Sequence, residues 1–595
     1  MIGLNDRALP GILKRALPGT LGHGPIPHHS VAPIRHAGLP DTARCCLPSA
    51  GVPNQSISGL LILPLQSGTL RGILSAELLR NATHPMIVVG QIKKGAYFDS
   101  ITLMRVGKEL AGLPGVADAA VVMGTSSNKA ILNFSGLLIS KFDEAGDTDL
   151  LLAVKARTQS AAATALASVD GLLTKATRKT GTNGEARPSS LAAALQVMPE
   201  ANLAIVSVAG RYAGDVAWSA LESGLHVMLF SDNVPLETEI ALKKYARKRG
   251  LLVMGPDCGT AIINGVPLAF ANVVNRGCIG IVAAAGTGLQ EVSCLISNAG
   301  AGISQAIGTG GRDVKQEVGG IMFIAALKAL AEDKQTRVIL LVSKPPHPEV
   351  LRRIERVTKG IRKPIVTLFL GAETRKGGPS TLEEAALQAV ALARAQNPDE
   401  VVSQLAARNQ DLNKLAKRAA AGRKPGQKYL RGLFSGGTFC AEAKVLFKGV
   451  LKDMFSNSPI RGVKQLRNSL VSQKNTVIDL GEDEFTVGRP HPMIDYSLRN
   501  RRILQEAEDP ETAVILLDVV LGYGANPDPA AELSSVLRQA AAKVSVICSI
   551  TGTDQDPQNR GRVEAALRKT GAAVMPSNAA ACGLAGRIIQ LLCPP

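Results

Sequence analysis

Two glycine-rich turns in the middle of the chain have the composition and spacing of an anion-binding site. Gly286-Thr287-Gly288 follows the apolar run 279–284 and precedes residues 289–297, whose spacing suits a helix. Gly310-Gly311-Arg312 follows a second apolar run, 303–307. A helix start presents unpaired backbone N–H groups and the positive end of the helix dipole, which together favour a phosphate. For one such turn alone, the alternative is a tight connection with no ligand.

Two further turns repeat this pattern. Gly436-Gly437-Thr438 lies between the apolar run 430–434 and a helical stretch at 439–447. Gly124-Thr125 precedes Asn128-Lys129, so Lys129 falls in the first turn of a predicted helix. A cation there opposes the helix dipole, and Lys129 is therefore either a ligand group for an anion or an ordinary exposed lysine.

Two cationic groups are candidates for catalysis. Lys344 ends the predicted strand 338–342, where it would neutralise a phosphate and stabilise charge on a leaving oxygen; the alternative is a lysine that reaches solvent. The prolines of the loop 488–495 exclude a helix and hold His491 between Arg489 and Asp495. That group can bind an anion and move a proton, unless Arg489 only pairs with Asp495.

The elements that must position these residues are short strands alternating with helices, which predicts an α/β protein of several domains. A chain of 595 residues is too long for one core and should form roughly three to five domains. The content of 46% apolar residues and 59 glycines agrees with many short strand-to-helix turns. We predict a ferredoxin-like α/β domain at 86–178, doubly wound sheets at 191–276, 277–397 and 429–595, and a linker at 398–428.

Residues 1–85 differ from the rest of the chain. They contain five of the eight histidines and frequent prolines, with little periodic apolar pattern. We expect a poorly ordered extension, because no ligand spacing supports the alternative of metal binding.

Composition also restricts the partners. A formal net charge of +18 suggests small phosphorylated ligands, since the basic residues lack the aromatic interleaving of nucleic-acid-binding surfaces. We interpret the basic helix 243–249 as a solvated face. No apolar stretch reaches the about 18 residues that span a bilayer, and we expect no membrane association and a cytoplasmic protein. The nine cysteines are scattered, which predicts buried, reduced thiols and no metal site.

Several of these segments resemble a known family. The stretch 278–320 and the loop 254–259 are similar to the α-subunit of succinyl-CoA synthetase, and Gly436-Gly437-Thr438 resembles a helix start in its β-subunit. From Met86 onwards the chain resembles the FdrA family, a branch of the ADP-forming acyl-CoA synthetases, and we expect Met86 to be the true start. The segments that support this resemblance are IKKGAYFDS (92–100), MGTSSNKA (123–130), LVMGPDCGT (252–260), IGTGGRD (307–313), VSKPP (342–346) and VGRPHPMID (487–495).

The resemblance implies a Rossmann-like CoA-binding-type domain at 191–276 and two flavodoxin-like succinyl-CoA-synthetase-type ligase domains after it. It implies CoA or a nucleotide as cofactor, with Asp257 and Cys258 at cofactor-binding positions. The chain departs from the synthetases at two places. No histidine occupies 371–378, where the synthetases carry a phosphorylated histidine, and Lys344 stands near the place of a glutamate that contacts it.

Three functions agree with this pattern. The first is an acyl-CoA synthetase-like protein that handles an acyl phosphate or CoA-type anion without the phosphohistidine, as one subunit of a complex with partners encoded nearby. The second, associated with the FdrA family, is a subunit of an oxamate carbamoyltransferase that uses carbamoyl phosphate in allantoin and purine breakdown. The third is a non-catalytic subunit that binds CoA or a metabolite.

Overall fold

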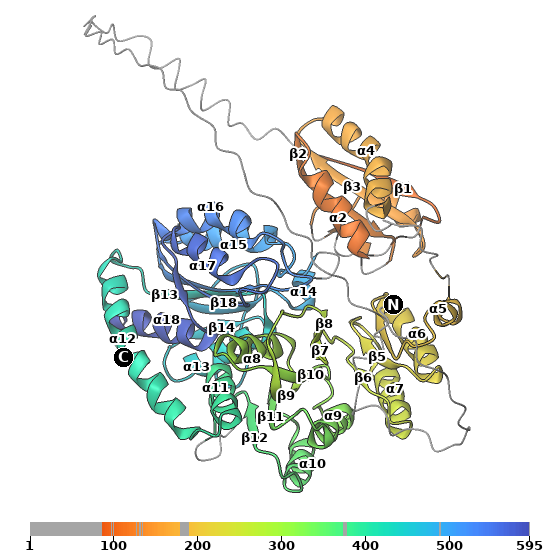
Figure 1. The fold of residues 1–595 in the computed structure, drawn as a ribbon. Coiled ribbons are helices and arrows are strands. Elements are labelled where there is room, and N and C mark those ends of the chain that lie inside the picture. Colours follow the sequence, from red (N-terminus) through yellow and green to blue (C-terminus); the bar gives the residue numbers. More distant parts are fainter. Residues whose placement is uncertain are drawn as a thin grey trace, which may run out of the picture. The chain divides into compact units, whose positions relative to one another are not determined.

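The computed structural model describes residues 86–96, 98, 100–125, 128–129, 132–133, 135–178, 188, 190–372, 378–486 and 490–593. The predicted extension 1–85, Arg489 and most of the segment 371–378 lie outside these residues. The described chain forms four separate sheets joined by helices, which confirms the predicted multidomain α/β class (Figure 1). No described helix is long and apolar enough to cross a membrane.

The first sheet belongs to a small α/β domain with strand order β1-β3-β2, in which β2 and β3 are antiparallel. This topology agrees with the predicted ferredoxin-like arrangement. Its elements are β1 (Ile87–Lys93), α2 (Ser100–Ala111), β2 (Val116–Met123), η2 (Ser140–Glu144), β3 (Leu150–Ala156) and α4 (Gln159–Arg178).

The second sheet has three parallel strands in the order β4-β5-β6, with helices between them, as the alternating pattern at 191–276 predicts. Small residues of α6 and α7 face the strands and form its core. The elements are α5 (Leu191–Val197), β4 (Leu203–Val206), α6 (Gly210–Glu222), β5 (His226–Leu229), α7 (Leu236–Lys248) and β6 (Val253–Met254).

The third sheet has the order β12-β11-β9-β10-β7-β8, and its first four strands are parallel. An antiparallel hairpin, β7–β8, extends its edge. The strands are β7 (Thr260–Ile263), β8 (Val266–Ala269), β9 (Arg276–Ala284), β10 (Ile303–Gly308), β11 (Val338–Ser343) and β12 (Ile365–Phe369). The helices are α8 (Gly286–Asn298), α9 (Ile321–Glu332), α10 (Pro348–Thr358) and α11 (Leu382–Ala393).

The fourth sheet is all parallel, in the order β15-β14-β16-β13-β17-β18-β19. Its strands are β13 (Tyr429–Phe434), β14 (Met454–Ser456), β15 (Lys464–Gln465), β16 (Asn475–Asp479), β17 (Thr512–Val520), β18 (Ser545–Thr551) and β19 (Ala573–Met575). Its helices are α13 (Gly437–Phe447), α14 (Asp483–Thr486), α15 (Ser497–Glu508), α16 (Pro529–Ala541), α17 (Arg560–Arg568) and α18 (Asn578–Leu592).

In the third sheet β9 lies between β10 and β11, and in the fourth sheet β13 lies between β16 and β17, so both sheets reverse their strand order at the first parallel strand, as flavodoxin-like sheets do. In such sheets ligands bind beyond the carboxyl ends of the two adjacent strands at which the strand order reverses. Those strands are β9 and β11 in the third sheet and β13 and β17 in the fourth. The turns after them hold Gly286, Lys344 and Gly436, so the topology places these predicted site residues at two switch points.

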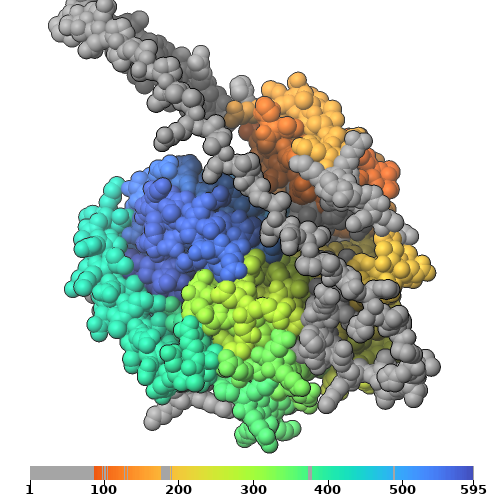
Figure 2. Space-filling model, in the orientation of Figure 1, coloured from red at the N-terminus to blue at the C-terminus, as the bar shows by residue number. Residues whose placement is uncertain are grey.

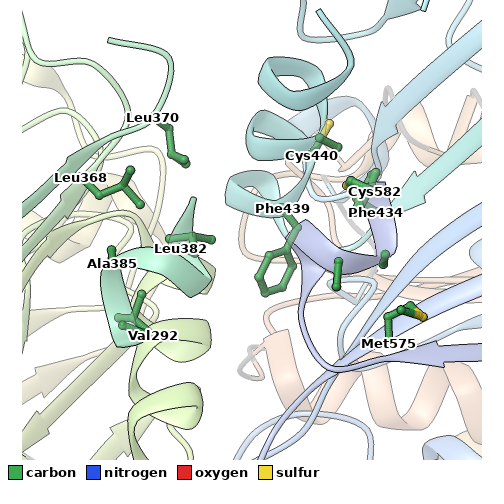
Figure 3. Close-up of a cluster of buried hydrophobic side chains, with 14 of the residues drawn as sticks. Val292, Leu368, Leu370, Leu382, Ala385, Phe434, Phe439, Cys440, Met575 and Cys582 are labelled. Carbon is green, nitrogen blue, oxygen red and sulfur yellow. The ribbon is translucent and has the colours of Figure 1, made fainter. Parts of the chain in front are cut away.

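One hydrophobic core joins the third and fourth sheets with their helices, which are called the two layers below. It contains β9, α8 and α11 side chains of the third sheet together with those of α13 and α18 from the fourth. Figure 3 shows members of this cluster, including Val292 and Leu382 on one side and Phe439 and Cys440 on the other. The space-filling view shows the same two layers, green and blue, in direct surface contact (Figure 2).

The segment predicted as a linker contains a 23-residue helix, α12 (Asp399–Ala421). Its Leu412 and Ala416 are buried in the shared core. The connection between the two layers is therefore part of the folded body.

The interpretation of helix 243–249 as a solvated face is wrong for Lys243. This side chain is fully buried, and its ammonium lies 2.8 Å from both Glu239 and Asp313. Asp313 also accepts hydrogen bonds from the backbone N–H groups of Met322 and Phe323, at the start of α9. The buried ion triad thus ties α7 of the second sheet to the third sheet.

Candidate functional site

The glycine turns that begin α8 and α13 touch each other. The backbone N–H of Thr438 donates to Thr287 Oγ1 at 3.2 Å. A Cβ added at Gly288 would lie 2.9 Å from Thr438 Cγ2, and one added at Gly436 would lie 2.9 Å from Thr287 Cγ2. Glycine is therefore required at both positions because the turns approach closely.

Neither helix start is capped by the side chain of its own N-cap residue, although Thr287 Oγ1 accepts from the N–H of Thr438 in the first turn of α13. The N-cap residues are Ala285 for α8 and Gly436 for α13, and neither offers an oxygen from its side chain. The first N–H groups of a helix have no partner within the helix. The structure therefore places two uncapped helix N-termini together, with additive positive potential at the point where they meet.

Lys344 lies level with the start of α8. Ser343 pairs with Ala284 across β11 and β9, so the next residue, Lys344, stands beside the N-cap Ala285. Its side chain is exposed, and the described residues offer it no ion-pair partner within 4 Å. Its charge opposes the rise in the pKa of both Asp257 and Asp479, so Lys344 lies within electrostatic reach of carboxyl groups on two different sheets.

Asp257 faces this region from the loop after β6. Desolvation by the surrounding protein first, and then the charges of Asp232 and Asp483, raise its pKa to about 6, against the opposing effects of Arg312 and Lys344, although the residue keeps an exposed surface. The neighbouring Cys258 is buried with its Sγ 3.5 Å from the carbonyl oxygens of Thr260 and Gly308, and burial raises its pKa to about 12. Cys258 therefore supports the loop, and cofactor binding by these two residues stays a prediction.

His491 lies beside the fourth sheet. Its Nδ1 accepts from the backbone N–H of Met493, so Nε2 carries the proton of the neutral ring. Burial and the nearby Arg499 lower its pKa to about 4. Asp495 pairs with Lys108 and accepts from the N–H of Ser497. Of the predicted group, the structure therefore describes His491 and Asp495 only.

The turn after β10 is used mainly for packing. Gly310 has φ +81°, and a Cβ there would lie 2.4 Å from the carbonyl oxygen of Pro256, whereas Gly311 faces open space. The guanidinium of Arg312 binds Glu239 at 2.8 Å and the carbonyl oxygen of Val234 at 2.8 Å. A phosphate-binding role for this turn stays a prediction.

The turn in the first domain also has local contacts. Gly124 packs against the carbonyl oxygen of Gly146, and Thr125 Oγ1 accepts from the N–H of Asn128. The ammonium of Lys129 donates to the carbonyl oxygen of Ala145 at 2.7 Å. These contacts fit a structural lysine, and the anion role of Lys129 stays a prediction.

Three residues near the helix starts were not predicted from the sequence: Asp479, Ser435 and Asp518. The carboxylate of Asp518 accepts from the N–H of Ser435 at 2.7 Å and from its Oγ at 2.6 Å, which fixes the residue before the α13 turn. The buried Arg499 donates to the carbonyl oxygen of Asp518. An acidic residue at the carboxyl end of an apolar strand is a usable signal, and both Asp479 and Asp518 have it.

Two buried glutamates link the third and fourth sheets, because each accepts a hydrogen bond from the first residue of a helix that belongs to the other sheet. Glu291 of α8 accepts from the N–H of Asn578, the first residue of α18. Glu442 of α13 accepts from the N–H of Leu382, the first residue of α11. Each site helix thus caps a helix of the other layer, and the two layers cannot separate without uncovering both carboxyl groups.

Because Glu291 and Glu442 are buried, the stability of the protein should depend on pH. Burial raises the pKa of Glu291 and of Glu442 to about 7. A carboxyl whose native pKa is raised loses stability as pH rises from its unfolded pKa to its native one, by about 1.4 kcal/mol for each pH unit between the two. The free energy of unfolding of Glu291→Gln, measured from urea midpoints, should therefore rise relative to that of the unmodified protein as pH increases from 5 to 8. The exposed Glu317→Gln is the control, and a difference that does not change with pH would contradict the expectation.

Comparisons with known proteins match three stretches of the chain. A CoA-ligase family model matches residues 433–588, and a CoA-binding domain model matches 275–371. A model described as AllF, heavy metal-associated domain, matches 86–189. The CoA-binding match falls on the third sheet, whereas the sequence analysis places a CoA-binding-type domain at 191–276, so the domain assignments stay predictions.

The residues of the first domain do not fit a heavy metal. The stretch 86–189 contains neither cysteine nor histidine. Among the residues that the structure describes, no group of three histidine, cysteine, aspartate or glutamate side chains is placed to hold a metal ion.

The Uncharacterized protein YahF of Escherichia coli is 39% identical over 517 residues, which cover 83% of this chain and 97% of YahF. The succinate–CoA ligase [ADP-forming] subunit alpha 1 of Archaeoglobus fulgidus is 28% identical over 181 residues, 30% of this chain and 60% of that subunit. A solved dinucleotide-forming acetyl-coenzyme A synthetase 1 of Ca. Korarchaeum cryptofilum is 15% identical, with a TM-score of 0.25, over 65% of this chain and 82% of that one. The chain belongs to the family of YahF and, by its CoA-ligase and CoA-binding domains, to the succinyl-CoA synthetase-like superfamily of acyl-CoA synthetases.

Proposed function

We propose that this protein transfers an acyl group directly between an acyl phosphate and an acceptor, without a phosphorylated enzyme intermediate. The contact between Thr287 and Thr438 is the observation that supports this most strongly, because it joins two uncapped helix starts at one point. The phosphate group would bind to the first-turn N–H groups other than that of Thr438, which donates to Thr287 Oγ1. Lys344, at the adjoining strand end, would neutralise it.

The reaction needs no covalent histidine. The nucleophile of the acceptor attacks the acyl carbon, the bond from that carbon to the phosphate oxygen breaks, and phosphate leaves with the bonding electrons. The helix N-termini and Lys344 stabilise the charge that develops on that oxygen. This agrees with the lack of a histidine at 371–378 and with a lysine near the place of the synthetase glutamate.

CoA is the acceptor that the superfamily suggests, and the second sheet offers it suitable groups. Tyr212 is 45% exposed at the start of α6, and the guanidinium of Arg211 stacks over its ring at 4.8 Å. An exposed aromatic ring and a cation at an uncapped helix start suit an adenine and a pyrophosphate. Arg211 also pairs with Asp147. When bound, CoA would supply its thiol as the nucleophile.

A carbamoyl group transferred between carbamoyl phosphate and an amide such as oxamate is the second candidate. It is suggested by the segments that resemble the FdrA family. It uses the same phosphate site and Lys344. Under either candidate, we propose that partner subunits encoded nearby complete the reaction, since no ATP-grasp domain is recognisable in the sequence.

Phosphate release distinguishes these candidates. The full chain, alone and with its operon neighbours, would be mixed with acetyl phosphate and CoA, or with carbamoyl phosphate and oxamate. Release that requires CoA supports the first candidate, and release that requires oxamate supports the second. No acceptor-dependent release in either mixture would contradict catalysis and favour a subunit that binds CoA or a metabolite to regulate a partner.

A further inference from the structure

Asp479 places a carboxylate at the first residue of α13. It ends β16, where it pairs with Phe434 of β13, so it lies level with the strand end that leads into the Gly436-Gly437 turn. The side chain is only 3% exposed. A Cβ added at Gly437 would lie 2.8 Å from Asp479 Oδ2, so this oxygen touches the uncapped helix start.

One oxygen of this carboxylate is bound and the other is open. Asp479 Oδ1 accepts from the backbone N–H of Gly481 at 3.0 Å, whereas the described residues offer no hydrogen bond to Oδ2. Asn457 holds the backbone on both sides, through the N–H and the carbonyl oxygen of Asp479. A carboxylate fixed in this way, with no hydrogen bond from the described residues to its second oxygen, is available to a ligand at the start of α13.

Several neighbouring groups change the pKa of Asp479. Burial and Glu482 raise its pKa to about 6, while Lys344 of the third sheet, the N–H of Gly481 and Lys444 of α13 oppose that rise. The Nε2 atom of the neutral His491 ring also lies near Asp479. A Cβ added at Gly481 would lie 3.0 Å from His491 Nε2 and 3.2 Å from Asp479 Oδ1, so the two groups lie near one point.

We propose that Asp479 is the residue that moves the proton in the acyl transfer. The inference rests on the proposed function and specifies its acceptor as a nucleophile that must lose a proton, a thiol or an amide nitrogen. Asp479 Oδ2 takes that proton as the nucleophile bonds to the acyl carbon. The bond from carbon to phosphate oxygen breaks, and the proton passes from Asp479 to the departing phosphate.

A consequence can be measured without turnover. A dianion at the two helix starts lies beside Asp479 Oδ2, and repulsion between like charges favours the protonated carboxyl. Anion binding should therefore bring a proton onto the protein and tighten as pH falls. Sulfate is the suitable probe, because it mimics a phosphate dianion and does not itself titrate near neutral pH.

The experiment is calorimetry of sulfate binding to the full chain at pH 7, in two buffers with different ionisation enthalpies, and at pH 6 and pH 8. The unmodified protein should take up protons on binding and should bind sulfate several-fold more tightly at pH 6 than at pH 8. Asp479→Asn should bind with clearly less proton uptake and a weaker pH dependence, the remainder coming from Asp257. Asp453→Asn, a surface aspartate of the same sheet paired with Lys464 and Lys474, should behave like the unmodified protein.

The outcomes separate the two proposals. Proton uptake in Asp479→Asn that equals that of the unmodified protein overturns the role of Asp479 and leaves the anion site in place. No sulfate binding by the unmodified protein overturns the proposed function and this inference with it. Urea midpoints verify folding, and Asp479→Ser, which also removes the titrating group in a smaller side chain, replaces the asparagine variant if that variant fails to fold.

Discussion

Lys344→Met is expected to lower acyl-transfer turnover by about 10²–10³-fold while leaving the urea midpoint unchanged. The substitution keeps the length of the side chain and removes its charge, which stands beside the start of α8. Removing one group that stabilises a developing oxyanion costs roughly 2.7–4 kcal/mol. Because the side chain is exposed in the free protein, folding does not depend on that charge.

The measurement is turnover and sulfate affinity for Lys344→Met beside Lys359→Met. Lys359 is exposed at the end of α10, and its replacement by methionine should change neither quantity. Activity of Lys344→Met within a factor of two of the unmodified protein would show that Lys344 lies on the surface without a catalytic part. Loss of sulfate binding together with turnover would locate the effect at the phosphate group.

Lys243→Met should destabilise the protein by roughly 3–5 kcal/mol, the largest stability effect that we expect. The ammonium of Lys243 is the partner of two buried carboxylates, Glu239 and Asp313, and also donates to the carbonyl oxygen of Thr309. Breaking a buried ion group by removing one member leaves charges without compensation inside the protein. The single tryptophan, Trp218 in α6, reports unfolding of the same domain by fluorescence in urea.

Two further variants make this test specific. Lys244→Met removes the neighbouring exposed lysine and should leave the free energy of unfolding within about 0.5 kcal/mol of the original. Replacing all three charges, as Glu239→Gln, Lys243→Met and Asp313→Asn together, should recover much of the lost stability because no buried ion remains. An equal loss in the triple variant would assign the effect to packing and not to charge.

Local sequence pattern predicted the strand, turn and helix order around the site. The apolar run 279–284 and the spacing at 289–297 correspond to β9 and α8 in the structure. The glycines at 286–288 and 436–438 begin α8 and α13 as expected. These features were accessible because a strand end, a glycine turn and a helix start are determined by neighbours within a few residues.

The sequence by itself also predicted that the reaction uses no phosphorylated histidine. The segment 371–378 contains no histidine, and Lys344 follows the strand 338–342, whatever the fold around them. Residue identity and strand position were sufficient to expect a cation near a phosphate and no covalent relay. They were not sufficient to say which carboxylates surround that cation.

Only the tertiary structure decided how distant segments meet. Thr287 and Thr438 are 151 residues apart, and Glu291 and Asn578 are 287 apart, yet each pair is in hydrogen-bond contact. The sequence around Lys243 is as rich in charged residues as a surface helix, but the Lys243 side chain lies in the core. Periodicity shows which face of an element is buried, but the partner of that face depends on packing across the whole chain, and local pattern contains no record of that packing.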